Sequence, residues 1–343
     1  MMSSTTIPFE TLSQRIEQIF LNVGACPAQA GAVARVIAKG ERDDCKSHGV
    51  YRIAGLLRTI RAGKVDATSD PVLDDAGGGV IRVDAQGGFS PAAFELGAPV
   101  LAERARDLGV AALVINDCTH FSALWPEIEA LTDMGLAGLA MCPSYAVVAP
   151  AGGTAPLLGT NPIAFGWPRP DRDPFVFDIA TSVAARGEIE LHRQQGKPLP
   201  QGWALDAEGQ PTTDPEAALD GAMLPFGAHK GSAIAIMIEL LAGSMIGDRT
   251  SREALDYLGS TTILPNHGEL ILAFAPERFS AGGAAAAMAS AETLLGGIED
   301  QGARLPSQRR FAARARAQAG GIPLSDAEWA DLDRLRDVGL DAV

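Results

Sequence analysis

A short polar segment, DDCKSHGVYRI at residues 43–53, places Ser47, His48 and Arg52 close together just after an apolar helical pattern ends. Near a helix start Ser47 can act as a cap, and Gly49 allows another molecule to approach His48 closely. Arg52 follows His48 by four residues and so falls on the same helical face. A histidine that donates a proton beside an arginine that binds a carboxylate suits reduction of a C=O or C=N group next to that carboxylate. The alternative is a capping serine with a surface histidine and arginine.

A second candidate segment, CTHFSALWPEIE at residues 118–129, follows an apolar strand pattern that ends near Asn116. The segment should lie at the C-terminal edge of a strand and open a helix whose free N–H groups can bind a phosphate or a carboxylate. We expect His120 and Ser122 to point into this opening. The alternative is an ordinary strand-to-helix loop with a histidine cap.

Two turns in the middle of the chain carry further polar groups. In APLLGTNPIAFGWP the turn exposes the hydroxyl of Thr160 and several backbone N–H groups, as many buried turns also do. In FVFDIATS an apolar strand ends near Asp178, which can hold ribose or amide groups or cap the next helix. Glu188 lies in that next helix, and a carboxylate that reached His48 would orient its ring and raise its pKa.

The segment LPFGAHKGSAIAIMIELLAG, residues 224–243, places His229 and Lys230 immediately before a helical pattern. The pattern is apolar on nearly every face, so we expect this helix to be buried. A basic pair at a helix N-terminus suits a pyrophosphate or a carboxylate. The alternative is that Lys230 only extends into solvent.

A basic cluster near the C-terminus interrupts a chain that is otherwise acidic. Its arginines are Arg304, Arg309, Arg310, Arg314 and Arg316. Such a run usually forms a solvated helix face, and a site for a ribose phosphate is the more specific alternative. His192 and His267 have no comparable context and receive no role.

Composition excludes several classes of function. The 28 Lys and Arg residues against 42 Asp and Glu give a net charge of −14, which disfavours nucleic acid and anionic membrane as partners. Residues 1–14 lack an export signal, and the longest apolar run, 233–242, is interrupted by Glu239, so we expect no membrane span. The four dispersed cysteines favour reduced thiols and the cytoplasm, and the dispersed histidines disfavour a metal site.

Hydrophobic periodicity predicts helices at both ends of the chain and strands in its middle. Three helical patterns, the third stopping at Gly63, precede a strand at 79–85, a helix at about 91–108 and a strand at 109–117. Short apolar runs separated by Pro- and Gly-rich loops then indicate a second α/β domain, with helices near 183–195 and 230–246. The 38 glycines include no G-x-G-x-x-G between a strand and a helix, so a dinucleotide would bind on a non-Rossmann architecture.

Taken in order, six motifs resemble the malate/L-lactate dehydrogenase family, which lacks a Rossmann domain. They are SHGVYR, THFSALW, LLGTNPIAF, FDIATS, GWALDAEGQPTTDP and LPFGAHKGSA. THFSALWP and HKGSA make the chain most similar to the branch that reduces Δ1-piperideine-2-carboxylate and Δ1-pyrroline-2-carboxylate to L-pipecolate and L-proline.

The resemblance implies roles for individual residues. Ser47, His48 and the acid at position 188 would form a hydrogen-bonded relay in which His48 donates the proton. That branch has Asp where this chain has Glu188. Arg52 and Thr160 would hold the substrate carboxylate. The cofactor, NADPH with NADH as an alternative, would contact His120, Phe121, Ser122, Ala123, Leu124, Asp178, Ile179, Ala180, His229, Lys230, Arg304, Arg309 and Arg310.

The resemblance also implies an α/β fold in which helical N- and C-terminal portions embrace a largely antiparallel cofactor-binding sheet, usually in a homodimer. We expect residues 1–117 and 301–343 to form the helical, catalytic and dimerisation domain, and 118–300 the NAD(P)H-binding domain. A 2-hydroxy-acid dehydrogenase acting on malate, lactate or ureidoglycolate is the alternative within this fold, with His48 as the base. A catalytically silent scaffold is disfavoured by a set of polar residues that are not needed to bury a core: Ser47, His48, Arg52, Thr160, His229 and Lys230.

Overall fold

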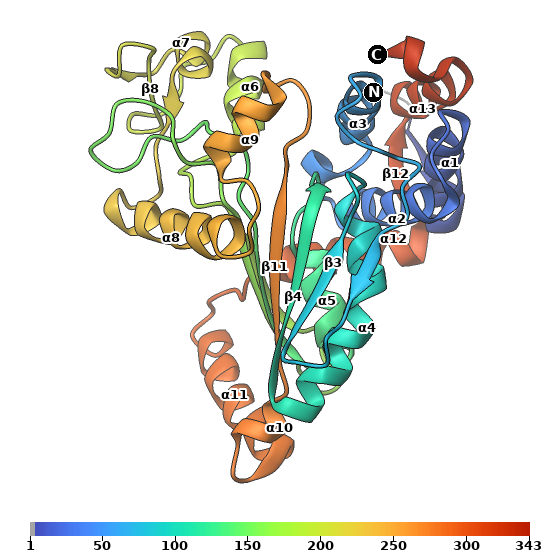
Figure 1. The fold of residues 1–343 in the computed structure, drawn as a ribbon, viewed down its shortest axis with the longest axis vertical. Helices are drawn as coiled ribbons and strands as arrows, with labels where there is room; N and C mark the ends of the chain where they lie inside the picture. Colours follow the sequence, from blue (N-terminus) through green and yellow to red (C-terminus); the bar gives the residue numbers. More distant parts are fainter. Residues whose placement is uncertain (1–3) are drawn as a thin grey trace.

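A seven-stranded sheet forms the centre of the molecule in the computed structural model, which describes residues 4–343 (Figure 1). Across the sheet the order is β2-β3-β4-β11-β5-β6-β7, and β3 and β4 are its one parallel pair within these residues. This confirms the expected largely antiparallel sheet. Its strands are β2 (Val72–Asp74), β3 (Val80–Asp84), β4 (Val110–Thr119), β5 (Ala137–Met141), β6 (Ile163–Trp167), β7 (Phe175–Ile179) and β11 (Asn266–Phe274).

Each face of this sheet buries an apolar layer against different helices. On one face Leu113 and Ile115 of β4 pack with α4 (Ser90–Leu108) and α5 (Trp125–Asp133). On the other face Val114 packs with Ile238 of α8 (His229–Glu239). The alternation along β4 follows from the two-residue period of a strand, which turns successive side chains to opposite faces.

A helical body beside the sheet is built from both ends of the chain. Figure 1 shows the N-terminal helices in blue next to α13 in red, with both termini nearby. The strand β1 (Ser4–Ile7) pairs antiparallel with β12 (Ile322–Ser325), which ties the two ends together. The other elements of this body are α1 (Phe9–Asn22), α2 (Pro27–Arg42), η1 (Lys46–His48), η2 (Val50–Arg52), α3 (Ile53–Arg61), α12 (Gln308–Gly320), α13 (Asp326–Val338) and η4 (Gly339–Ala342).

A small module lies on the opposite side of the sheet, near α8 and α9 (Ser251–Leu258) in Figure 1. It has its own apolar cluster, which includes Val148, Ile189 and Met223. Its elements are α6 (Arg186–Gln194), β8 (Ala204–Leu205), β9 (Pro211–Thr212), α7 (Pro215–Asp220) and β10 (Ala222–Met223). The remaining helices are η3 (Leu240–Ser244), a π-helical turn that continues α8, and α10 (Pro276–Phe279) and α11 (Gly283–Glu299) at the far end of the sheet.

Two expectations differ from the structure. The expected boundary at residue 117 falls inside β4, which pairs with β3 on one side and β11 on the other, so one sheet crosses that boundary. The helix expected to be buried is α8, and Ile236 and Met237 on this helix are exposed, as is Leu240 at the start of η3. The prediction of a buried helix was wrong, because an apolar sequence does not show which faces of a helix are covered by the sheet.

The stretch considered for an export signal includes residues 1–3, which lie outside the described residues. Between residues 4 and 343, no helix is both long and apolar enough to cross a membrane.

Candidate active site

The Ser47–His48 segment forms two short 3-10 turns, η1 and η2, and Gly49 separates them. The hydroxyl of Ser47 lies 3.0 Å from Nδ1 of His48, so it bonds the imidazole and does not cap a helix as expected. Ser47 is exposed and His48 is half-buried. This contact fixes one ring nitrogen and leaves Nε2 for another partner.

Two glycines let this turn lie directly on α2. A Cβ on Gly40 would come within 2.5 Å of the carbonyl oxygen of His48, and a Cβ on Gly49 within 2.0 Å of Oε1 of Glu41. Oε1 of Glu41 instead accepts a hydrogen bond from the backbone N–H of Val50 at 2.9 Å. Gly49 was expected to let another molecule approach His48. In the structure it instead lets Glu41 of the same chain lie against the turn.

Arg52 lies against the same turn. Its Nε donates to the carbonyl oxygen of Ser47 at 2.8 Å. Burial, with a smaller contribution from the positive charge of Arg52, lowers the pKa of His48 to about 3. His48 is therefore neutral at physiological pH in the chain without ligand.

Glu188 is not brought to His48 in this structure. It is exposed in the first turn of α6, and its backbone N–H donates to Ala185 at 2.9 Å. Between residues 4 and 343 no carboxylate hydrogen-bonds or ion-pairs with His48. The pKa of His48 moves down, opposite to the rise expected from a carboxylate at the ring, because burial and an arginine dominate its surroundings.

Thr160 is held next to the end of β7. Its carbonyl oxygen accepts hydrogen bonds from the backbone N–H of Thr181 at 2.8 Å and from the Thr181 hydroxyl at 2.9 Å. The following residue, Asn161, is fully buried and bonds Glu239 of α8 at 2.7 Å. The turn is therefore anchored from two sides, and Thr160 itself remains half-buried.

Asp178 occupies the helix start that was expected to hold a ligand anion. Its Oδ2 accepts from the backbone N–H of Leu124 at 2.8 Å and of Trp125 at 3.0 Å. Asp178 thus caps α5, the helix that follows the His120–Leu124 segment. It does not cap α6, which is the next helix after Asp178 in the sequence. Burial raises the pKa of Asp178 to about 6 although these N–H donors oppose the rise.

His229 and Lys230 are exposed at the first turn of α8. The preceding Ala228 has φ 52° and ψ −110°, a conformation that a residue with a Cβ rarely adopts. The turn is bonded to the end of β7 through Phe226, whose N–H donates to the carbonyl of Thr181 at 3.0 Å. Thr160, the Asp178–Ala180 strand end and the basic pair are therefore neighbours.

The five arginines divide into two groups. Arg304, Arg309 and Arg316 are exposed. Arg310 is buried, ion-pairs with Glu129 and lies 4.2 Å above the ring of Trp125, and Arg314 bonds Asp43 at 2.5 Å. Because Arg310 is committed to a buried carboxylate, the structure does not support its expected contact with a cofactor, whereas Arg304 and Arg309 are accessible.

A buried polar cluster next to His120 was missed by sequence reasoning. Its members are His120, Glu127, Cys142, His267 and Glu269, all at most 5% exposed. Burial raises the pKa of Glu127 to about 8 and that of Glu269 well above its ordinary value, and it lowers the pKa of His120. His48 and the positive charge of Arg52 contribute to the lowering of the His120 pKa, because the Ser47–His48 turn lies near this ring. The available signal was Glu269, an acid in the otherwise apolar run ELILAF.

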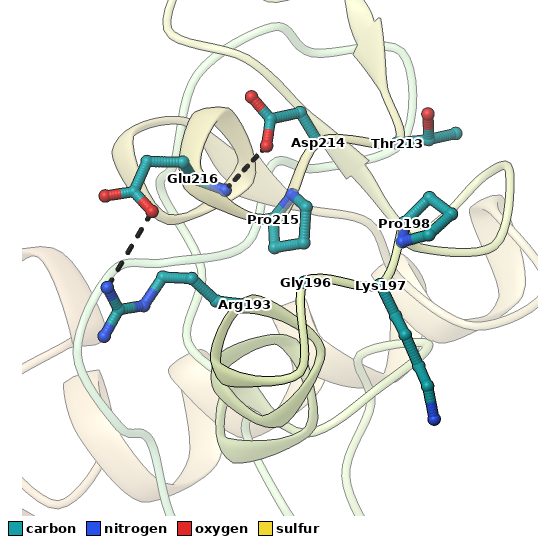
Figure 2. A pocket seen from close by; sticks show the side chains of 8 residues that line it. All are labelled: Arg193, Gly196, Lys197, Pro198, Thr213, Asp214, Pro215 and Glu216. Atoms are coloured by element: carbon teal, nitrogen blue, oxygen red, sulfur yellow. Dashed lines mark hydrogen bonds and ion pairs between the residues drawn. The ribbon is translucent and has the colours of Figure 1, made fainter.

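Two surface hollows, each of about 440 Å³, lie outside the Ser47–His48 turn. Figure 2 shows the first, between α6 and α7, where Arg193 pairs with Glu216 at 3.8 Å. None of its eight lining residues belongs to the predicted site. The second is lined partly by Leu305, Pro306 and Gln308, beside Arg304 and Arg309. Only the second hollow adjoins a segment expected to contact a cofactor.

Comparison with known proteins agrees with the six motifs. Residues 7–333 match the family model described as malate/L-lactate dehydrogenase. A Δ1-pyrroline-2-carboxylate reductase of Agrobacterium fabrum is 65% identical, covering 100% of both chains. A Δ1-pyrroline-2-carboxylate/Δ1-piperideine-2-carboxylate reductase of Pseudomonas aeruginosa is 57% identical over 88% of this chain and 90% of its own. The crystal structure of a Δ1-piperideine-2-carboxylate reductase from Pseudomonas syringae superposes with a TM-score of 0.92 at 39% identity, covering 96% of this chain and 99% of that one.

Proposed function

The chain belongs to the malate/L-lactate dehydrogenase family, and from that membership we propose that it is an NAD(P)H-dependent reductase of cyclic ketimino acids. Its substrates are Δ1-pyrroline-2-carboxylate and Δ1-piperideine-2-carboxylate, and the products are L-proline and L-pipecolate. Relatives that carry these activities in their names align over nearly the whole chain, which supports the proposal. One set of contacts supports it most directly: the Ser47–His48 hydrogen bond with Arg52 bonded to the same turn.

Arg52 is the proposed clamp for the substrate carboxylate. Its Nε is already bonded to the carbonyl of Ser47, so the terminal guanidinium nitrogens are left to bind an anion. The hydroxyl of Thr160 would provide a second contact. A carboxylate held by Arg52 places the adjacent C=N group beside His48.

His48 is the proposed proton donor. In the chain without ligand the pKa of His48 is about 3, and the positive charge of Arg52 contributes to this value. A bound substrate carboxylate offsets that charge, so the pKa of His48 rises when substrate binds. Nδ1 is bonded to Ser47, and Nε2 is the nitrogen that would protonate the substrate nitrogen.

Glu188 remains a prediction as the third member of the relay. Its exposed carboxylate would have to move toward Ser47 or His48 in the working enzyme. If it does so, Glu188→Gln lowers kcat as strongly as Ser47→Ala. A kcat equal to that of the wild type removes Glu188 from the mechanism.

The residues proposed to hold the cofactor suit a nicotinamide dinucleotide. Within residues 4–343, Oγ of Ser122 is buried without a hydrogen-bond partner, as a polar group that awaits a ligand would be. Lys230, Arg304 and Arg309 are exposed cations that can bind its phosphates. When bound, the cofactor supplies hydride to the carbon that bears the carboxylate. We propose NADPH over NADH because Arg304 and Arg309 suit a ribose phosphate.

We further propose that the protein forms a homodimer in the cytoplasm. Family resemblance supports the dimer. The four cysteines all carry free thiols, which suits a reducing compartment.

Purified protein tests the proposal directly. Loss of NADPH absorbance is measured with each cyclic imine and with pyruvate and oxaloacetate. We expect kcat/KM to be highest for a cyclic imine. Faster turnover of the open-chain 2-oxo acids would instead identify a 2-hydroxy-acid dehydrogenase.

A further inference from the structure

Three side chains from separate elements meet in the buried cluster beside the proposed active site. His120 follows β4, Glu127 lies on α5 and Glu269 lies on β11. Their ligand-type atoms all lie within 4.8 Å of one another. Nε2 of His120 is 3.9 Å from Oε2 of Glu269, so a small rotation of either side chain would form a hydrogen bond.

These atoms have no other partner among the described residues. Both carboxyl oxygens of Glu269, Oε2 of Glu127 and Nε2 of His120 are buried without a hydrogen bond. Leaving a buried polar group unsatisfied is costly, and several such groups in one place are unusual in a native protein. The arrangement therefore implies that the groups satisfy one another in the working enzyme.

The strand geometry around Glu269 is also irregular. The pairing of β11 with β4 shifts register between His267 and Glu269. Such bulges re-aim side chains and occur often beside active sites. The shift in register turns Glu269, an acidic residue in an otherwise apolar strand, toward His120.

Protonation decides which atom donates. Burial and the nearby Glu127 raise the pKa of Glu269, which favours the protonated carboxyl that can donate. Burial, with a smaller contribution from the neighbouring His267, lowers the pKa of His120, which favours a neutral ring with one accepting nitrogen. Nδ1 of His120 faces Sγ of Cys142 at 4.0 Å, and Nε2 faces Glu269.

We propose that Glu269 is a positioning residue for His120: its carboxyl donates a hydrogen bond to Nε2 of His120 and holds the ring with its own proton on Nδ1. The consequence for catalysis rests on the proposed function, in which His120 belongs to the segment that holds the cofactor. A fixed ring orientation there would keep the cofactor-binding segment ordered beside the Ser47–His48 turn.

The tautomer can be measured without substrate. The chain has five histidines, and NMR of ¹⁵N-histidine-labelled protein distinguishes Nδ1–H from Nε2–H rings, with His120→Gln assigning the signal. We expect Nδ1–H in the wild type and in Glu269→Gln, whose amide still donates. Glu269→Leu should lose that preference. A wild-type His120 with its proton on Nε2, or an unchanged tautomer in Glu269→Leu, would overturn the proposal.

Turnover provides the second measurement. We expect Glu269→Leu to lower kcat about tenfold and Glu269→Gln to stay within about twofold of the wild type. A role limited to stability predicts that both variants keep the kcat of the wild type per folded molecule and differ from it only in unfolding free energy. Urea unfolding of each variant therefore separates positioning from folding.

Glu239 provides a matched control, and a bound metal is the competing explanation. Glu239 is a buried glutamate whose two oxygens already accept from Asn161 and Ser251, so Glu239→Gln should leave the His120 tautomer unchanged. Stoichiometric transition metal in the purified protein, lost in Glu269→Gln, would overturn the proposal in favour of a metal site. If the tautomer results hold and no cyclic imine is reduced, the proposed function fails and the role of Glu269 stands.

Discussion

His48 shows how strongly its neighbours decide the properties of a side chain. The same imidazole would be a cation near neutral pH beside a carboxylate, and it is neutral here because burial and Arg52 disfavour its charge. A neutral ring can still donate from one nitrogen while the other accepts from Ser47. The proposed substrate, an anion, is the species that changes this balance.

Replacing His48 tests its role in proton transfer. We expect His48→Ala to lower kcat by about 10²–10⁴-fold, the usual contribution of a general acid, while the Kd for NADPH changes little. NADPH consumption gives kcat, and quenching of protein fluorescence gives Kd. His192→Ala is the control, because His192 is bonded to Pro198 outside the site. Turnover of His48→Ala equal to that of this control would contradict the mechanism.

Glu127 gives a pH dependence of stability whose sign can be worked out. Its pKa is about 8 in the folded chain against 4.5 in an unfolded one, so between these values the folded state binds more protons. Stability from this residue therefore falls as pH rises from about 4.5 to about 8, by at most about 1.4 kcal/mol per pH unit. Glu127→Gln cannot ionise and should lose less stability over that range.

Urea unfolding at several pH values measures this difference. The unfolding free energy of Glu127→Gln minus that of the wild type should grow with pH and become constant above about pH 8. A difference that does not vary with pH would show that Glu127 ionises as an ordinary glutamate.

At the scale of elements, a buried ionic network fixes the start of the 43–52 segment. Asp43, at the end of α2, accepts from Arg42 at 2.7 Å and from Arg314 of α12 at 2.5 Å. Arg314 also bonds Glu129 of α5 at 2.7 Å. Burial acts to raise the pKa of Asp43, but the hydrogen bonds from the two arginines outweigh it and lower that pKa. Helices distant in sequence are thereby joined behind the Ser47–His48 turn.

Removing one member of this network should destabilise the protein. Arg314→Met leaves Asp43 buried with fewer partners, and we expect a loss of about 3 kcal/mol, the lower end for a broken buried pair, since Arg42 and Arg310 remain. Arg316→Met, on the same helix but exposed, should change stability by no more than about 0.5 kcal/mol. Equal unfolding free energies for the two variants would mean that the network contributes nothing net.

At the scale of the whole molecule, the reactive turn belongs to a body made from both ends of the chain. Leu332 and Leu335 of α13 share an apolar cluster with Ile16 of α1 and Ile53 of α3. The Ser47–Arg52 segment runs directly into α3. The C-terminal helix therefore supports the candidate site although it contributes no residue to it.

Truncating a core residue of α13 tests this support. We expect Leu335→Ala to lower the unfolding free energy by about 2–5 kcal/mol, because Leu335 is 1% exposed and its removal leaves a cavity. Activity should disappear at a correspondingly lower urea concentration, in step with the fluorescence of Trp329. Val338→Ala, at a half-exposed position of the same helix, is the control. Activity that outlasts the fluorescence change would separate the site from this body.

The sequence by itself determined the family through its six motifs, and the largely antiparallel sheet was implied by that resemblance. Local patterns determined most helix positions: the predicted third helix, for example, appears as η1, η2 and α3 and ends just before Gly63. Ser47, His48 and Arg52 were identified in the same way because they lie in one short segment. Local spacing is enough when the interacting groups are only a few residues apart.

Only the tertiary structure decided which distant groups meet. Asp178 caps α5, Arg310 forms an ion pair with Glu129, and Glu188 does not contact His48. Glu269 was not predicted as a site residue. It faces His120 because β11 pairs with β4 and the register of that pairing shifts next to Glu269. Burial and ion pairing across elements depend on packing between segments far apart in the chain. For that reason residue types and spacing predicted the chemistry of the Ser47–Arg52 segment, but could not predict the partners that tune it.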